Sequence, residues 1–245
     1  MKLLVTGAGG MLGLDLCRQL AQAGHTVLAA TRAVLDVRDR AQVKQVFADF
    51  QPERVYHLAG LTDVDRCERE PEAALHTNAL GTQHVALACQ AAGAPLVYVS
   101  TIAVFDGQKA EAYTEFDAPN PQNWYARSKH HGEAAVRELA DKHYIVRAGW
   151  MFGGGSEDKK FVARILHLAQ TQHSLRVVDD KFGSPTYTRD LAQALSKLSE
   201  TGLYGLYHMV NVGAPASRLE IAQHILREAG ITDCELIPVS SAELC

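Results

Sequence analysis

The chain has no cluster of basic residues and no closely spaced cysteine pair, and each absence argues against certain classes of function. Its formal net charge is −4, and no run of lysine or arginine occurs, which argues against nucleic acid as a partner. The five cysteines are scattered without a CxxC spacing. This pattern argues against a disulfide framework and against a zinc site.

A long hydrophobic segment is also missing. No stretch approaches the ~20 uninterrupted apolar residues of a transmembrane helix. The first ten residues, MKLLVTGAGG, resemble a strand that runs into a glycine turn, without the apolar core and cleavage site of a signal peptide. We therefore expect no membrane partner and a cytoplasmic location. The 245 residues suffice for one large α/β domain with a smaller lobe.

Short apolar runs alternate with amphipathic stretches through the first 150 residues. The runs KLLVTG, HTVLAAT, PERVYHLAG, PLVYVST and HYIVRAG predict five strands, and glycines such as Gly24 and Gly93 mark the ends of intervening helices. Buried strands separated by helices predict an α/β fold with a doubly wound parallel sheet covered on both faces. After residue 150 the alternation loosens, which predicts a smaller lobe interleaved with the sheet.

The segment VTGAGGMLG has the spacing GxxGxxG immediately after the first strand and at the start of a helix. Glycine lets the backbone turn sharply and approach a pyrophosphate, and the helix N-terminus offers free N–H groups. A plain tight turn is the alternative, but the strand–turn–helix context favours a dinucleotide site. We therefore predict a Rossmann-like NAD(P)-binding domain over residues 1–150, with cofactor contacts from Gly7, Gly10, Met11, Leu12 and Gly13.

The end of the second strand bears on which dinucleotide binds. NAD-selective sites often place an acidic residue there for the ribose 2′-hydroxyl, whereas a nearby arginine accommodates a 2′-phosphate. Thr31 and Arg32 stand at this position, which favours NADP(H) and leaves NAD(H) possible. Arg32 could instead be a solvated loop charge. We predict that Asp36 and Val37 contact the adenine, although Asp36 could equally cap the next helix.

The stretch YARSKHHGE carries Tyr125 and Lys129 four residues apart, on one face of a predicted helix. A nearby cation lowers the pKa of a phenol, and such a pair can pass a proton to a carbonyl oxygen while hydride attacks the carbon. The spacing alone is common. It gains weight because a strand ending in Ser100-Thr101 places hydroxyls at the carboxyl edge of the sheet, where ligands of such folds bind.

Together these motifs resemble the extended short-chain dehydrogenase/reductases, and within them the dTDP-4-dehydrorhamnose reductase family. The segments that carry the resemblance are GAGGMLG, LAGLTDVDRCE, VYVSTIAVFDG, YTEFDAPNPQNWYARSKHHGE and DKFGSPTYTRDLA. The resemblance implies a catalytic triad of Thr101, Tyr125 and Lys129, with Tyr125 and Lys129 also touching the cofactor. It implies further cofactor contacts from Leu58, Ala59, Gly60 and Thr62. It implies substrate contacts from Thr101, Ala103, Tyr125 and Trp150. His130 and His131 are interpreted as helix surface.

The resemblance implies NAD(P)H-dependent reduction of a nucleotide-linked 4-keto-6-deoxysugar, with dTDP as the expected nucleotide and residues 151–245 as a small substrate-binding lobe. Two departures stand out. Ile102 and Ala103 replace an aspartate and a tyrosine of the family pattern, and relatives continue past Cys245 with a further segment, which suggests a short variant or a truncated chain. No metal ligand set is predicted, and a magnesium requirement and a homodimer remain possible.

Two alternative functions remain. One is a nucleotide-sugar epimerase or dehydratase, although many dehydratases carry an acidic residue where this chain has Ile102. The other is a non-catalytic NADP-binding subunit, resembling the regulatory subunit of methionine adenosyltransferase.

Overall fold

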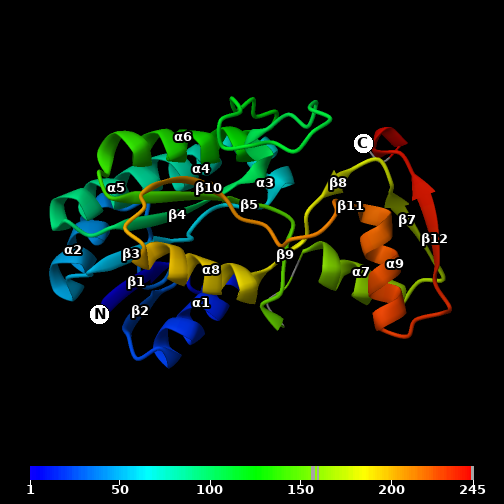
Figure 1. Cartoon of the computed structure of the whole chain (residues 1–245), viewed down its shortest axis with the longest axis horizontal. Helices are drawn as coiled ribbons and strands as arrows, with labels where there is room; N and C mark the ends of the chain where they lie inside the picture. The colour runs from blue at the N-terminus through cyan, green and yellow to red at the C-terminus, as the bar shows by residue number, and fades with distance from the viewer. Residues whose placement is uncertain (156–157, 159, 244–245) are drawn as a thin grey trace.

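A six-stranded parallel sheet organises the larger part of the computed structural model, which describes residues 1–155, 158 and 160–243 (Figure 1). The sheet order is β10-β5-β4-β3-β1-β2. The strands are β1 (Lys2–Thr6), β2 (Thr26–Ala30), β3 (Arg54–His57), β4 (Leu96–Thr101), β5 (His143–Ala148) and β10 (Gly205–His208). The five predicted strands are confirmed. The sixth, β10, was not predicted because it lies in the less regular second part of the chain.

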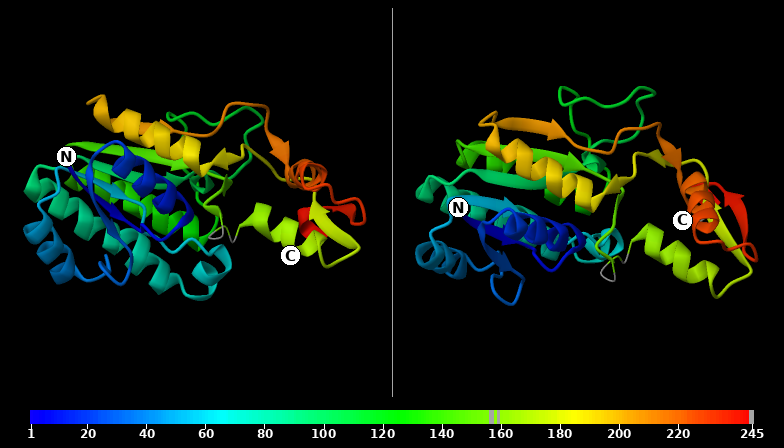
Figure 2. Two further views of the ribbon diagram at one scale, coloured as in Figure 1. Left: turned by 90° about the horizontal axis from the view of Figure 1, so that it is seen from below. Right: turned by 60° about the horizontal axis from the view of Figure 1, so that its bottom comes forward.

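Helices cover both faces of this sheet, as the doubly wound prediction requires (Figure 2). One core lies between the sheet and α2, α5 and α6, and a second lies between the sheet and α1 and α8. The bounds are α1 (Met11–Gln22), α2 (Arg40–Phe50), α5 (Gly81–Ala92), α6 (Trp124–Leu139) and α8 (Thr188–Glu200). Strand β1 has β2 on one side and β3 on the other. The chain therefore reverses direction across the sheet at β1, and such switch points bind ligands.

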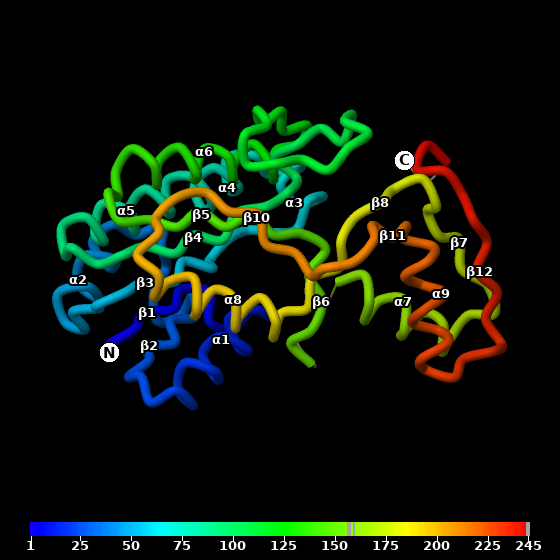
Figure 3. Tube along the Cα trace, viewed as in Figure 1, coloured from blue at the N-terminus to red at the C-terminus, as the bar shows by residue number. Residues whose placement is uncertain are grey.

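A smaller lobe lies beside the carboxyl end of the sheet and holds the C-terminal end of the chain (Figures 1 and 3). Its core joins two helices to a parallel strand pair and includes Ile165, Leu175 and Leu226. Its elements are α7 (Phe161–Ala169), β7 (Ser174–Val178), α9 (Arg218–Glu228), β12 (Glu235–Val239) and η4 (Ser241–Glu243).

Short strand pairs and two further elements connect the lobe to the sheet. The pairs are β6 (Met151–Phe152) with β9 (Thr186–Tyr187), and β8 (Phe182–Gly183) with β11 (Ala216–Ser217). Both α8 and β10 follow residue 150 and yet pack on the large sheet. The division into functional domains at residue 150 stays a prediction, and the end of the chain at Cys245 lies outside the described residues.

The long helix expected from Pro71 to Gly93 contains a π-helical turn. It consists of α4 (Pro71–Leu75), the turn η1 (His76–Leu80) and α5. Proline occupies the first turn, and Gly93 closes α5 in the left-handed conformation at φ 64°. The helix end that the sequence predicts at Gly93 is therefore confirmed. A π-turn inside a helix often marks a functional position, and here it carries Asn78.

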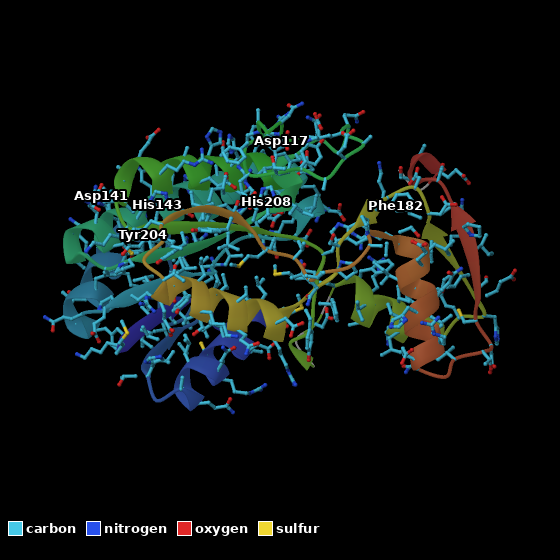
Figure 4. All side chains as sticks on the ribbon, in the orientation of Figure 1. Asp117, Asp141, His143, Phe182, Tyr204 and His208 are labelled. Atoms are coloured by element: carbon cyan, nitrogen blue, oxygen red, sulfur yellow. The ribbon has the colours of Figure 1, made fainter. Side chains whose placement is uncertain are left out.

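A loop of residues 105–123 connects β4 to α6, after the short helix η2 (Ile102–Val104). The loop is attached to β10, because the His208 backbone N–H donates a 2.7 Å hydrogen bond to Glu115. Figure 4 shows His208 beneath the loop segment that carries Asp117. In the part of the chain that the structure describes, no helix is both long and apolar enough to cross a bilayer.

Candidate active site

The three glycines of the turn after β1 have different environments. Gly7 has φ +69°, and a Cβ there would lie 2.6 Å from the backbone nitrogen of Ala59. A Cβ on Gly13 would lie 2.5 Å from the Gly7 carbonyl oxygen. Gly10 is less constrained, since its nearest atom would be 3.4 Å away. Gly7 and Gly13 therefore serve close packing, while Gly10 leaves backbone surface accessible, as a pyrophosphate-binding turn requires.

A cavity of about 830 Å³ lies between this turn, the carboxyl ends of the strands and the small lobe. Most residues that the sequence predicts for the site line it together. They are Gly7, Gly10, Met11, Leu12, Gly13, Leu58, Ala59, Gly60, Thr62, Thr101, Ala103, Tyr125, Lys129 and Trp150.

Arg32, Asp36 and Val37 are not among the residues that line this cavity. The Arg38 guanidinium holds both Asp36 carboxylate oxygens and, with Arg32, lowers the Asp36 pKa to about 2. Asp36 does not cap α2, because the side chain of Asp39 accepts the first N–H bonds of that helix. The Arg32 side chain is 71% exposed, and Val37 is buried in the core. Their cofactor contacts stay predictions.

Thr101 and Tyr125 are brought together by β4 and α6. Thr101 ends β4, and its hydroxyl accepts a 3.1 Å bond from the Ala103 N–H. Tyr125 lies in the first turn of α6, which is capped by the side chain of Asn123. Burial raises the Tyr125 pKa, although a hydrogen bond with Thr101 opposes the shift. The expectation that Lys129 lowers this pKa is therefore wrong here, because desolvation outweighs the favourable contacts.

Lys129 is buried one turn further along α6. Its ammonium donates a 2.8 Å hydrogen bond to the Val99 carbonyl and lies 4.1 Å from the centre of the Tyr98 ring. Burial lowers the Lys129 pKa to about 7, while the Glu133 carboxylate acts in the opposite direction. Lys129 can therefore gain or lose a proton near neutral pH.

Glu133 joins α6 to two strands of the sheet. Its carboxylate accepts a 2.6 Å bond from Ser100 and bonds of 2.9 and 2.7 Å from Arg147. Arg137 donates a further 3.0 Å bond. Burial by itself would raise the Glu133 pKa, but the bonds from Arg147 and Ser100 keep it below its usual value. The carboxylate thus fixes α6 beside Thr101, the residue that follows Ser100.

Asn78 connects the cofactor-side loop to the same helix. Its side chain exchanges two hydrogen bonds with the backbone of Leu61, at 2.8 and 2.9 Å, and donates a third to Ser128 at 2.9 Å. Gly132 allows this approach, because a Cβ there would lie 2.5 Å from the Asn78 carbonyl oxygen. Asn78 was not singled out from the sequence, because this bridging role depends on contacts between distant segments.

The two histidines after Lys129 differ in exposure. His131 is exposed, as interpreted from the sequence. The side chain of His130 is 32% exposed, and its Nδ1 lies 3.6 Å from Glu133.

Two cationic cavity residues, Lys160 and Arg218, were not singled out from the sequence. They come from opposite ends of the lobe segment, and no spacing motif connects them to Trp150. Trp150 itself has φ 48°, and Gly183 makes room for it, since a Cβ there would lie 2.3 Å from the indole. Among the described residues, no group of three or more His, Cys, Asp or Glu side chains is placed to hold a metal.

The fold and the site define an extended short-chain dehydrogenase/reductase: a doubly wound sheet, a glycine turn at its switch point, and a Tyr–Lys helix beside it. The chain belongs to the family described as RmlD substrate binding domain, whose model matches residues 1–245.

Named relatives agree with this membership. The chain is 41% identical to the spore coat polysaccharide biosynthesis protein SpsK of Bacillus subtilis, over 99% of this chain and 84% of that protein. It is 40% identical to the dTDP-4-dehydrorhamnose reductase of Mycobacterium tuberculosis, over 99% of this chain and 80% of the relative. A solved dTDP-4-dehydrorhamnose reductase of Bacillus anthracis, in complex with NADP, is 38% identical. The match covers 99% of this chain and 85% of the Bacillus anthracis chain, and the two structures superpose with a TM-score of 0.95.

Proposed function

We propose that this protein is an NADP(H)-dependent reductase of a dTDP-linked 4-keto-6-deoxysugar, with NAD(H) as a possible substitute cofactor. The observation that carries the proposal is the convergence of Thr101, Tyr125 and Lys129 on one cavity, with Trp150 in the same lining. Relatives named as dTDP-4-dehydrorhamnose reductases support the substrate class.

The residues around the switch point fit a nicotinamide dinucleotide. Gly10 leaves the backbone accessible at the N-terminus of α1, where a pyrophosphate is favoured. The segment from Leu58 to Thr62 forms the adjacent wall, and Lys129 would hold the nicotinamide ribose. When bound, the cofactor supplies a hydride to the carbonyl carbon of the sugar.

The protein supplies the proton. The Tyr125 hydroxyl, whose raised pKa keeps it protonated at neutral pH, donates its proton to the carbonyl oxygen, so that the ketone becomes an alcohol and Tyr125 a phenolate. Thr101 hydrogen-bonds the same oxygen. Lys129, with a pKa of about 7, would hold the nicotinamide ribose and can return a proton to the phenolate. Ala103 and Trp150 contact the sugar.

The lining of the cavity favours reduction over dehydration. Dehydration of a sugar requires an acid beside the Thr101 hydroxyl, but the next residue is Ile102, whose side chain packs so close that a Cβ on Gly149 would lie 2.3 Å from it. None of the described residues that line the cavity is an aspartate or glutamate. The complete Thr101, Tyr125 and Lys129 set also favours an enzyme over a non-catalytic NADP-binding subunit.

The roles of the two parts of the chain follow from this proposal. Residues 1–150, together with α8 and β10, would hold the cofactor, and the lobe around α7 and α9 would close over the nucleotide sugar. The homodimer and the cytoplasmic location stay predictions.

The test is a direct assay in which the absorbance of NADPH is followed after addition of a dTDP-4-keto-6-deoxysugar. We expect NADPH to be oxidised only when the sugar is present, and NADH to be oxidised more slowly. Mass spectrometry should identify a dTDP-6-deoxysugar as the product. A UDP-linked ketosugar is the matched control for the nucleotide. NADPH binding without any reduction of a ketosugar would contradict the proposal and favour the non-catalytic alternative.

A further inference from the structure

The cavity is lined by charges of one sign. Among its described lining residues the charged side chains are Lys129, Lys160 and Arg218, and no carboxylate balances them. Two of the three ammonium and guanidinium groups are already engaged. Lys129 donates to the Val99 carbonyl, and Lys160 lies 3.3 and 3.2 Å from the carbonyl and hydroxyl oxygens of Thr62.

Arg218 differs from both lysines. Its guanidinium carbon lies 4.2 Å from the centre of the Trp150 ring and 4.6 Å from that of Phe161. Within the described part of the chain, its side chain forms no hydrogen bond and no ion pair. Burial lowers the pKa of the guanidinium below its usual value. A cation that is partly withdrawn from water and lacks an anionic partner is unfavourable, and a ligand anion would remove that cost.

The position of Arg218 is fixed by the fold of the lobe. It is the first residue of α9, directly after Ser217, which forms a reciprocal capping box with Glu220. The Arg218 backbone N–H donates to the Lys181 carbonyl. The Trp150 ring that it contacts is itself confined by Gly183. The guanidinium is therefore held beside the residue that we propose for the sugar, with five N–H donors suited to a phosphate.

The cofactor has a separate anion site. Its pyrophosphate is expected at Gly7, Gly10 and Gly13, in the turn after β1 and the first turn of α1, and further cofactor contacts are expected from the segment after β3. Arg218 comes from the small lobe and contacts the ring of Phe161 in that lobe and the ring of Trp150, which follows β5. A second anionic ligand is therefore the better match for its charge.

We propose that Arg218 binds the diphosphate of the nucleotide-sugar substrate, with Trp150 holding the guanidinium from one side and the sugar near it. The inference rests on the proposed function, because it assigns the charged group of the same second ligand. Arg218 thereby selects diphosphate-linked sugars over free sugars.

The test measures binding without turnover. dTDP is titrated by calorimetry into the protein with NADP⁺ present, and NADPH is titrated separately by fluorescence. We expect Arg218→Gln to weaken dTDP binding about 10- to 100-fold, the range for a lost hydrogen bond to a charged group. The affinity for NADPH should stay within about threefold of wild type. Arg218→Lys should recover part of the affinity. Arg227→Gln, an exposed arginine of the same helix, is the control and should change neither value.

Each contrary outcome separates the two proposals. Unchanged dTDP affinity in Arg218→Gln overturns this inference while leaving the reductase assignment intact, and so does an equal loss of NADPH affinity. If the wild-type protein binds UDP or GDP in place of dTDP, and Arg218→Gln weakens that ligand, only the nucleotide of the proposed function is wrong. Wild-type protein that binds none of the three overturns the diphosphate site.

Discussion

The two walls of the cavity are built in different ways. On the sheet side, buried polar side chains form a connected network in which Glu133, Ser100 and Arg147 fix the catalytic helix, and Asn78 fixes the cofactor-side loop. On the lobe side, Arg218 rests on aromatic rings. The sheet-side wall is therefore suited to chemistry, which needs fixed geometry. The lobe-side wall is suited to holding an anionic ligand.

The largest effect is expected where the sheet-side network is broken. Glu133→Gln removes the charge that Arg147 faces in the core, where the Arg147 side chain is 1% exposed. Loss of one partner of a buried ion pair costs about 3–5 kcal/mol, so the free energy of unfolding in urea should fall by that amount. Glu138→Gln, an exposed residue of the same helix, should stay within about 0.5 kcal/mol. Equal, small effects would mean that the network does not hold the helix.

A pH-dependent effect is expected at Lys129. Its pKa is lowered from 10.5 to about 7 in the folded protein, so the unfolded chain binds more protons between these values and stability rises with pH across that window. Lys129→Met removes this dependence. Below pH 7 the free energy of unfolding of the variant should exceed that of wild type by a few kcal/mol, at about 1.4 kcal/mol per unit of pKa shift. This difference should vanish above pH 10.

The measurement for Lys129 is a series of urea titrations from pH 6 to pH 10.5, with Lys142→Met, an exposed lysine, as the control. The control should follow wild type at every pH. A constant difference between Lys129→Met and wild type would show that the lysine is not desolvated as described.

Two glycines of the turn after β1 should respond differently to substitution, because one serves packing and the other serves cofactor binding. Gly13→Val should destabilise the fold by about 1–3 kcal/mol, because its side chain would collide with the Gly7 carbonyl. Gly10→Val should fold nearly normally and yet lose at least about 10-fold in NADPH affinity, because a side chain blocks the approach of the pyrophosphate. Urea titration and NADPH fluorescence distinguish the two. Normal NADPH affinity in a folded Gly10→Val would remove the cofactor from this turn.

The smallest effect is expected at Arg32. Its side chain is 71% exposed and lies 3.5 Å from Asp36, so Arg32→Ala should weaken NADPH binding by about 1.5 kcal/mol, the low end for a hydrogen bond to a charged group. NADH affinity should not change. Arg40→Ala, an exposed arginine nearby, is the control. Equal losses for both cofactors would make Arg32 irrelevant to the choice of cofactor.

The sheet-side wall was largely predictable from the sequence, because local spacing encodes it. The sequence spacing alone indicates a turn where glycines stand three residues apart after a strand. It likewise indicates a shared helix face where Tyr125 stands four residues before Lys129. The same holds for the five strands whose apolar runs are uninterrupted. Strand β10 was missed because GLYH is short and follows an irregular segment, so only pairing with β5 defines it.

The lobe-side wall was not predictable, because it depends on contacts between distant segments. Arg218 reaches the cavity only when α9 packs on α7 and β7, and no motif connects it to Trp150. The pKa of Tyr125 was mispredicted for a related reason. The sequence shows a cation one turn away, but it does not show the burial of the hydroxyl or the direction of the Lys129 side chain toward Val99.

The central claim is that Tyr125 transfers the proton, while the cofactor is held by other groups, the glycine turn and Lys129. Tyr125→Phe tests it most directly, because it removes one hydroxyl and keeps the ring. With a dTDP-4-keto-6-deoxysugar and saturating NADPH, turnover should fall by at least ~10²-fold, the usual size for general acid catalysis, and NADPH affinity should stay within a few-fold of wild type. Near-normal turnover in Tyr125→Phe would contradict the account.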